Sequence, residues 1–327
     1  MPAIIVCDTH CGVHGGSALW HQVNINLFKH IADTCVRRNI PHIIHLGDWF
    51  HDRKSLGLQT IHTSIETAEI IRDFETDILL GNHDLFYKYQ SKPTSLDIFR
   101  EFSNISIVDE VKTVMVDGYE LTLAPWNTET IPVCETLLGH LEVTGFGIPT
   151  KFKYEIGDFE QCGTVYSGHF HFPMELSNIK YLGAPYHMSF GESGDRRGYY
   201  IFNHGKLEFI EFGEYPRFLR LVASEDITES TVRDNIVKLT YTKDFGNNGN
   251  TRILEMVQSF KPVQLFTDFS QMKPEESQES QEEVLVSMDM KSGKEILFEY
   301  MERRTLPEHL KQGMMKRVLE NLMGEGV

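Results

Sequence analysis

Short apolar runs alternate with longer, helix-like stretches in the first part of the chain. The runs at 3–7, 42–46 and 77–80 have the length of buried strands. Between the first two runs, apolar side chains recur every four residues, as on one face of an amphipathic helix: Leu19, Val23, Leu27, Ile31 and Cys35. A second helical pattern lies between the second and third runs, at Ile61, Ile65, Ala68 and 71–74. This order of elements predicts an α/β fold.

From about residue 105 the pattern changes to short alternating runs, which are typical of strands. They lie at 105–108, 112–117, 119–124, 164–168, 179–182, 199–203 and 206–212. Taken with the preceding helices, these runs predict a domain over 1–213 in which β-sheets are packed between helices. We expect the candidate chemistry of the protein to lie in this domain.

A second, smaller unit is expected over 214–270. Apolar residues recur with helical spacing at Val232 and Ile236, and again at Ile253, Val257 and Phe260. Between them, 246–249 reads Gly-Asn-Asn-Gly, a sequence typical of turns. We therefore expect a small α/β domain here, separate from the first.

The last part of the chain is expected to be a linker followed by a helical tail. The expected linker is 271–284. Between 274 and 283 it has five Glu and no basic residue, and a segment of this composition is expected to remain solvated. The tail, 285–327, has helical patterns at 293–302 and 306–323, with a capping box formed by Thr305 and Glu308. Its apolar stripe favours a partner-binding helical motif. The alternative is that the tail packs against its own chain.

Composition excludes several classes of protein. Apolar residues make up 41% of the 327 positions and charged residues 24%, as in ordinary globular domains. No apolar stretch approaches the roughly 18 residues of a membrane helix, and the N-terminus lacks a signal-peptide pattern. Five cysteines without a CxxC pair indicate a reduced, cytoplasmic protein. The net charge of −16 argues against general coating of nucleic acid by the surface.

Five short polar motifs follow apolar runs, where open α/β sheets place their ligands. They are Asp8-x-His10, Gly47-Asp48-x-x-His51, Gly81-Asn82-His83-Asp84, Gly139-His140 and Gly168-His169-x-His171. Each motif alone would be read as a turn or as a core histidine. Five motifs that all supply oxygen or imidazole donors predict a shared metal site.

The types of donor indicate which chemistry such a site performs. Asp, His and Asn donors suit Mn, Fe or Zn, and no cysteine joins them. Seven candidate ligands with one shared carboxylate suffice for two ions. Two ions roughly 3.5–4 Å apart can hold a phosphoryl group and a hydroxide for in-line attack. Because a histidine bound to metal cannot deliver a proton, some of the site histidines must remain unligated.

The ordered set of motifs resembles the calcineurin-like metallophosphoesterase superfamily over residues 8–171. Protein phosphatases of that superfamily usually carry an Asp-Arg-Gly soon after the Gly-Asp, whereas this chain has Gly47-Asp48-Trp-Phe-His51. A histidine three residues after the aspartate is similar to SbcD-type nuclease subunits of double-strand-break-processing complexes. The segments 181–185 (Tyr-Leu-Gly-Ala-Pro) and 189–192 (Ser-Phe-Gly-Glu) strengthen that likeness. The length and the tail resemble recombination nuclease subunits of large tailed bacteriophages.

The resemblance implies a fold, a β-sandwich flanked by helices, and a role for each site residue. One metal would be bound by Asp8, His10, Asp48 and His171. The second would be bound by Asp48, Asn82, His140 and His169, with Asp48 bridging the two. His83 would be the general acid or transition-state stabiliser, supported by His51.

The resemblance also implies an activity and partners. We expect a manganese-dependent DNA exonuclease and endonuclease, with magnesium as a second possible ion. Residues 214–270 would form a capping domain that shapes DNA access, and 285–327 would bind a coiled-coil ATPase of the SbcC type. A homodimer is also implied. The alternatives are a metallophosphatase or cyclic-nucleotide phosphodiesterase, and a non-catalytic scaffold, which the intact set of donors argues against.

Other polar residues near the motifs receive no functional role. Nine of the fifteen histidines lie outside the proposed site and are expected to be ordinary structural or surface residues: His14, His21, His30, His42, His45, His62, His187, His204 and His309. Basic residues close to motifs, among them Arg196 and Arg197, are expected to be solvated surface.

Overall fold

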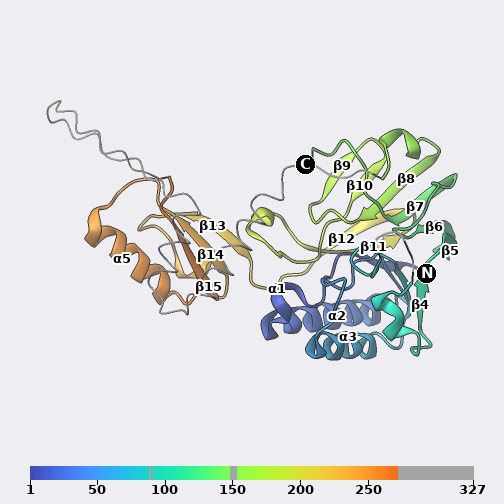
Figure 1. Ribbon diagram of the computed structural model, residues 1–327, viewed down its shortest axis with the longest axis horizontal. Coiled ribbons are helices and arrows are strands. Elements are labelled where there is room, and N and C mark those ends of the chain that lie inside the picture. The colour runs from blue at the N-terminus through green and yellow to red at the C-terminus, as the bar shows by residue number, and fades with distance from the viewer. Residues whose placement is uncertain (88–89, 91, 148–152, 272–327) are drawn as a thin grey trace, which may run out of the picture. The chain divides into compact units, whose positions relative to one another are not determined.

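The computed structural model describes residues 1–87, 90, 92–147 and 153–271, which form two six-stranded sheets and a smaller three-stranded sheet (Figure 1). The first sheet has the strand order β12-β11-β1-β2-β3-β4. Its strands are β1 (Ala3–Val6), β2 (His42–His45), β3 (Glu75–Leu79), β4 (Ile105–Val108), β11 (Gly198–Asn203) and β12 (Lys206–Glu211). Strands β1 to β4 run parallel, and β11 pairs antiparallel with β1. All six correspond to apolar runs that the sequence marks as strands.

The second sheet has the order β5-β6-β7-β8-β10-β9. Its strands are β5 (Lys112–Val116), β6 (Tyr119–Ala124), β7 (Cys134–His140), β8 (Cys162–Gly168), β9 (Met174–Leu176) and β10 (Ile179–Tyr181). Strands β6, β7, β8 and β10 run parallel. Strand β7 lies outside the strand-like runs that the sequence indicates, although its last two residues are the predicted Gly139-His140 motif.

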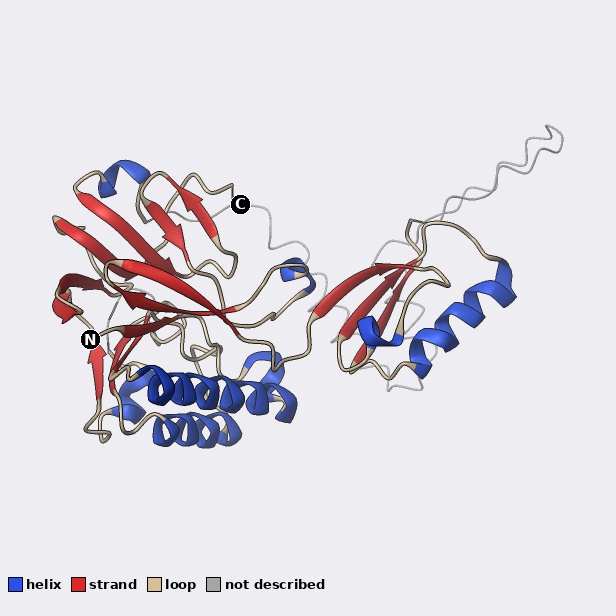
Figure 2. Ribbon diagram, turned by 180° about the vertical axis from the view of Figure 1, so that it is seen from behind, coloured by secondary structure: helices blue, strands red, loops and turns tan. Residues whose placement is uncertain are grey.

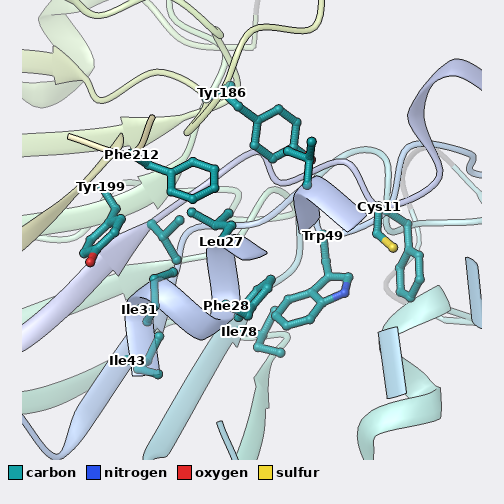
Figure 3. Close-up of a cluster of buried hydrophobic side chains, with 14 of the residues drawn as sticks. Cys11, Leu27, Phe28, Ile31, Ile43, Trp49, Ile78, Tyr186, Tyr199 and Phe212 are labelled. Carbon is teal, nitrogen blue, oxygen red and sulfur yellow. The ribbon is translucent and has the colours of Figure 1, made fainter. Parts of the chain in front are cut away.

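Helices α2 (Ala18–Arg38) and α3 (Leu58–Ile70) cover the outer face of the first sheet (Figure 2). Side chains alternate along β1, so that Ile4 and Val6 join the core under the helices while Ile5 joins the core between the two sheets. Leu27 and Ile31 of α2 lie close to Ile43 and Ile78 of the sheet (Figure 3). The four-residue spacing in the sequence is thus the buried face of a helix.

The remaining short helices fill the loops of this sandwich. They are α1 (Val13–Gly16), η1 (Ser95–Phe99), η2 (Ile156–Phe159) and η3 (Phe190–Glu192). Phe159 of η2 is fully buried against the outer face of the second sheet, in a core with Leu137, Val165 and Tyr181. The expected α/β sandwich flanked by helices is therefore present.

The unit after residue 213 is an α/β structure with three parallel strands. These are β13 (Phe218–Val222), β14 (Ile236–Thr240) and β15 (Gln264–Asp268), accompanied by α4 (Glu229–Val232) and α5 (Gly246–Ser259). Buried side chains of α5 and of the sheet, such as Ile253, Val257 and Leu239, share one core. We call 214–270 the cap unit.

Two local predictions in the cap unit are wrong. Ile236 begins strand β14 instead of continuing a helix, because β13 and β15 pair with it on both sides. The segment 246–249 is the first turn of α5 and not a free turn. The Asp244 carboxylate accepts hydrogen bonds from the Gly246 N–H and the Asn250 side chain, which ties the chain before the helix to its first turn.

The described residues of 1–274 form one compact unit. The division into 1–213 and 214–270 remains a prediction. Apart from Gln271, the expected linker at 271–284 and the expected tail at 285–327 lie outside the described residues. Within the described ranges, no helix has both the length and the apolar composition to cross a membrane.

Candidate metal centre

The five polar motifs meet at one edge of the two sheets. Asp8 and His10 follow β1, the motif of Asp48 follows β2, and that of Asn82 follows β3. From the second sheet, His140 is the last residue of β7, and the His169-x-His171 motif follows β8. Because these strands are parallel within each sheet, their carboxyl ends lie together and bring side chains far apart in the sequence into contact. All nine predicted site residues lie in or beside this cluster.

The loops reach this arrangement through strained backbone. Four of the site residues have positive φ angles: Asp8, His10, Asp48 and His169. Such conformations cost on the order of 1–3 kcal/mol each and persist only where surrounding contacts hold them. Gly81 is required for a different reason, since a Cβ atom there would lie 2.2 Å from the Asp48 backbone nitrogen. The chain therefore places these side chains at a cost in stability.

One group of potential ligands comprises Asp8, His10 and His171, whose donor atoms lie within 4.8 Å of one another. His10 Nε2 is 2.9 Å from His171 Nε2. His10 Nδ1 is buried and has no hydrogen-bond partner among the described residues. Burial, followed by the neighbouring histidines, holds the pKa of His10 well below its ordinary value. His10 is therefore neutral, the form in which imidazole binds a metal.

The second group comprises Asp48, His140 and His169. Asn82 lies between the two histidines: its Oδ1 is 3.1 Å from His140 Nε2 and 2.8 Å from His169 Nδ1. Asp8, Asp48 and His140 are all at most 1% exposed, whereas His169 is partly exposed. The cluster thus has a buried base and an accessible side.

Asp48 faces both groups. Its Oδ2 atom lies 3.7 Å from His10 Nε2, and its Oδ1 atom lies 3.4 Å from His140 Nε2. Each carboxylate oxygen is therefore directed to a different set of donors. Such an arrangement would suit a carboxylate shared by two ions. The bridging position that the resemblance implies for Asp48 remains a prediction.

The hydrogen bonds of His140 test whether the donors fit a cation. Its Nδ1 atom donates to the carbonyl oxygen of Leu46 at 2.7 Å, so in the neutral ring the Nε2 lone pair faces the oxygens of Asn82 and Asp48. Burial acts to lower the pKa of His140, but the negative charge of Asp48 outweighs it and raises the pKa to about 9. The negative charge that holds a proton on His140 this strongly would also attract a metal ion. The residues therefore fit a divalent cation.

His83 and His51 lie beside the first group and have a different environment. His83 Nδ1 is 2.6 Å from the backbone carbonyl oxygen of His51, and because a carbonyl only accepts, Nδ1 is the donor. The Nε2 atom of His83 is left for another partner. The His83 ring centroid lies 4.9 Å from that of His10, and both His51 and His83 are partly exposed. The side chain of His51 stacks on His83 at 5.8 Å but does not hydrogen-bond to it.

Asp84 is a site residue to which the sequence analysis assigned no role. It is fully buried, and its carboxylate accepts hydrogen bonds from the backbone N–H groups of Asp48 at 2.9 Å, Gly81 at 2.9 Å and Phe50 at 3.2 Å. It therefore joins the loops after β2 and β3. Its place as the last residue of the Gly-Asn-His-Asp motif is the signal that could have identified it.

Arg197 contradicts the expectation that basic residues near the motifs are solvated surface. Its side chain is 0% exposed, so it is not solvated surface, and its guanidinium donates to the carbonyl oxygens of His171 and Ala184. Glu192, which the sequence analysis noted only as part of a family segment, is 3% exposed and also contacts His171. The sequence could not show that either residue contacts His171, because His171 is 26 positions from Arg197 and 21 positions from Glu192.

Several histidines outside the site have structural partners, as expected. His45 is fully buried and lies 3.0 Å from the Thr9 hydroxyl through Nε2. His42 pairs with Asp77 at 2.9 Å. His309 lies outside the described residues.

Comparisons with known proteins support the resemblance that the motifs indicate. No family model matches the chain. Exonuclease subunit 1 of Enterobacteria phage T4 is 28% identical over 212 residues, which are 60% of this chain and 62% of that protein, so the chain spans less than two thirds of its relative. The structural match to nuclease MPE of Pseudomonas putida covers 64% of this chain and 87% of that nuclease, at 19% sequence identity. Its TM-score is 0.33, too low to support an argument about the fold. The predicted resemblance to a bacteriophage nuclease subunit is confirmed by the phage T4 relative.

Proposed function

We propose that the chain is a DNA nuclease subunit that hydrolyses phosphodiester bonds with two divalent metal ions. The observation that carries this proposal is the position of Asp48, whose two carboxylate oxygens face separate groups of donors while His83 lies beside them. The name of the phage T4 relative supports DNA as the substrate.

Each ion would be held by side chains from several loops. Asp8, His10, Asp48 and His171 would hold the first, and Asp48, Asn82, His140 and His169 would hold the second. Ions bound there would supply Lewis acidity to the scissile phosphate and to the attacking water. The alignment of the donors is maintained by backbone contacts such as the His169 N–H, which donates to both oxygens of Asp8 at 3.0 and 3.2 Å.

His83 would deliver a proton to the leaving oxygen or stabilise its charge. The His51 carbonyl holds Nδ1, so the ring presents Nε2 in a fixed orientation. The His83 N–H donates to Asp48 Oδ1 at 2.8 Å, which ties the backbone of the acid to the shared carboxylate. The partly exposed rings of His51 and His83 lie on the side from which a phosphodiester can approach.

The finer features of the proposal rest on the resemblance stated above. They are manganese as the preferred ion, both exonuclease and endonuclease activity, and a place in DNA repair, recombination and replication. The word "subunit" in the relative's name supports a partner protein. We assign the binding of an SbcC-like coiled-coil ATPase to 285–327 and control of DNA access to the cap unit. The protein would act as a homodimer in the cytoplasm of an infected host.

A comparison of substrates tests the activity. The full chain should degrade linear double-stranded DNA in Mn²⁺, more slowly in Mg²⁺, and not at all in EDTA. Small substrates, namely p-nitrophenyl phosphate and a cyclic nucleotide, serve for comparison. Faster hydrolysis of either small substrate than of DNA would favour a metallophosphatase or a cyclic-nucleotide phosphodiesterase.

The partner is tested separately. Deletion of 285–327 should abolish co-purification with the ATPase while metal-dependent hydrolysis of short DNA is retained. Unchanged co-purification would contradict the assignment of this segment. Sedimentation of the full chain measures whether it forms a homodimer.

A further inference from the structure

The one-turn helix η3 places a buried carboxylate against a proposed metal ligand. Glu192 is 3% exposed, and its Oε1 atom lies 3.2 Å from His171 Nδ1. Its Oε2 atom accepts a hydrogen bond from the Met188 N–H at 2.9 Å. The Ser189 hydroxyl also donates to Oε1, at 3.4 Å, so both oxygens have donors within the protein.

This contact determines how His171 presents its other nitrogen. Because a carboxylate only accepts, His171 Nδ1 is a donor, and Nε2 is directed to the cluster, 2.9 Å from His10 Nε2. The buried guanidinium of Arg197 holds the carbonyl oxygen of the same histidine. A carboxylate behind a histidine in this way orients the ring and increases its basicity as a ligand.

The same turn is attached to the cap unit by Phe190, two residues before Glu192. The Phe190 ring packs edge-to-face on Phe218 of β13 at 5.1 Å and on Phe266 of β15 at 5.5 Å. Arg220 of β13 donates to the Phe190 carbonyl oxygen at 3.0 Å and lies over its ring. Phe190 and Glu192 are the first and last residues of the same three-residue helix. The cap unit therefore contacts the element that holds His171.

We propose that Glu192 is a positioning residue for His171 and that the cap unit, through Phe190, holds Glu192 in place. The cap unit would then influence metal binding directly, in addition to any effect on DNA access. This inference rests on the proposed function, because it requires His171 to bind a metal ion.

The first test measures Mn²⁺ binding to full-length variants by calorimetry. Glu192→Gln has only one acceptor oxygen for three donors, and Glu192→Leu has none. We expect affinity at one of two sites to fall about tenfold in Glu192→Gln and up to about 100-fold in Glu192→Leu, with the other site unchanged. Glu211→Gln is the matched control, since this carboxylate is exposed and pairs with Arg196. The melting temperature of each metal-free variant reports whether it is folded.

The second test addresses the coupling to the cap unit. Phe190→Ala does not alter a residue that contacts His171, yet we expect it to weaken Mn²⁺ binding at the same site about threefold. Phe269→Ala, which removes an exposed aromatic ring stacked on Tyr241 in the same unit, should have no effect. In the Glu192→Leu background, Phe190→Ala should cause no further loss, because its effect passes through Glu192.

The outcomes separate this inference from the proposed function. If the unaltered chain binds no Mn²⁺, both are wrong. If it binds Mn²⁺ and cleaves DNA but folded Glu192→Leu binds with unchanged affinity, only the positioning role is wrong. Additive effects of Phe190→Ala and Glu192→Leu would overturn the coupling to the cap unit.

Discussion

Strands β2 and β3 carry histidine–aspartate clusters near both of their ends, and the two clusters differ in charge balance. Near the amino ends, His42 Nε2 lies 2.9 Å from Asp77 Oδ2, and the Lys112 ammonium binds the other oxygen of Asp77. At the carboxyl ends, Asp48 faces His10 and His140. We call the first the Asp77 cluster and the second the candidate metal centre.

The difference lies in what completes each cluster. In the Asp77 cluster a permanent cation, Lys112, balances the carboxylate, and hydrogen-bond donors meet acceptors. In the candidate metal centre the ion pairs of Asp48 are with histidines, and among the described residues no lysine or arginine forms an ion pair with Asp8 or Asp48. A histidine–aspartate contact is therefore not in itself a sign of a metal site. The absence of a permanently charged lysine or arginine is what distinguishes the two clusters.

The largest effect is expected from removal of the Asp48 carboxylate, which we propose is shared by two ions. Asp48→Asn leaves a single oxygen, which cannot face both groups of donors, so binding of both Mn²⁺ ions and cleavage of DNA should fall to background. Calorimetry and a DNA cleavage assay measure the two losses. Asp77→Asn makes the same chemical change in the other cluster and should leave both unchanged. An equal loss in both variants would remove the distinction between the clusters.

A large loss of activity without loss of metal is expected for His83→Ala. Removal of a general acid typically lowers the rate about 10²–10⁴-fold. Metal binding should persist, because the contact of residue 83 with Asp48 is made by its backbone N–H, which alanine retains. Parallel measurements of the cleavage rate and of Mn²⁺ affinity test this. A variant that binds no metal would show that His83 is a ligand and not the acid.

His51→Ala should have a smaller effect than His83→Ala. The bond that orients His83 is accepted by the backbone carbonyl of residue 51, which alanine retains, so only the stacked ring is lost. We expect a decrease of about tenfold in the cleavage rate, within the lower part of what positioning effects produce. A loss as large as that of His83→Ala would mean that the His51 side chain takes part in the chemistry itself.

The smallest effect is expected from Asp77→Asn on the stability of the fold. Burial acts to raise the pKa of Asp77, but the hydrogen bonds from His42 and Lys112 outweigh it and lower the pKa. A lowered pKa stabilises the fold above the unfolded value of about 3.9, and this contribution is lost as the pH falls through the folded value. Asp77→Asn should therefore cost about 1 kcal/mol of unfolding free energy at pH 7, given that Lys112 is partly exposed.

Urea denaturation at pH 7 and near pH 2 measures this contribution. The difference between the unaltered chain and Asp77→Asn should be present at pH 7 and should become smaller at the lower pH, as the carboxyl group begins to take up a proton in the folded state. A difference that is independent of pH would mean that the ion pair does not contribute to stability.

Much of the candidate metal centre could be predicted because its residues follow recognisable strands. Asp8, Asp48 and Asn82 follow three apolar runs, and the parallel pairing of β1, β2 and β3 places these strand ends side by side. His140 was placed mostly by its Gly-His motif and by the spacing to His169, since β7 was not among the strand-like runs. In the cap unit the helical spacing at Val232 and Ile236 was misleading, because pairing with β13 and β15 decided the structure there.

The sequence by itself determined which donor atoms are present and which end of the strands carries them. The tertiary structure alone decided that the oxygens of Asp48 face different groups, that Arg197 is buried, and that Glu192 supports His171. The physical reason is the distance along the chain: His10 and His171 are separated by 161 positions yet their nitrogens lie 2.9 Å apart. Local patterns record the conformation of a segment, but ligand geometry and charge balance arise only where distant segments pack together.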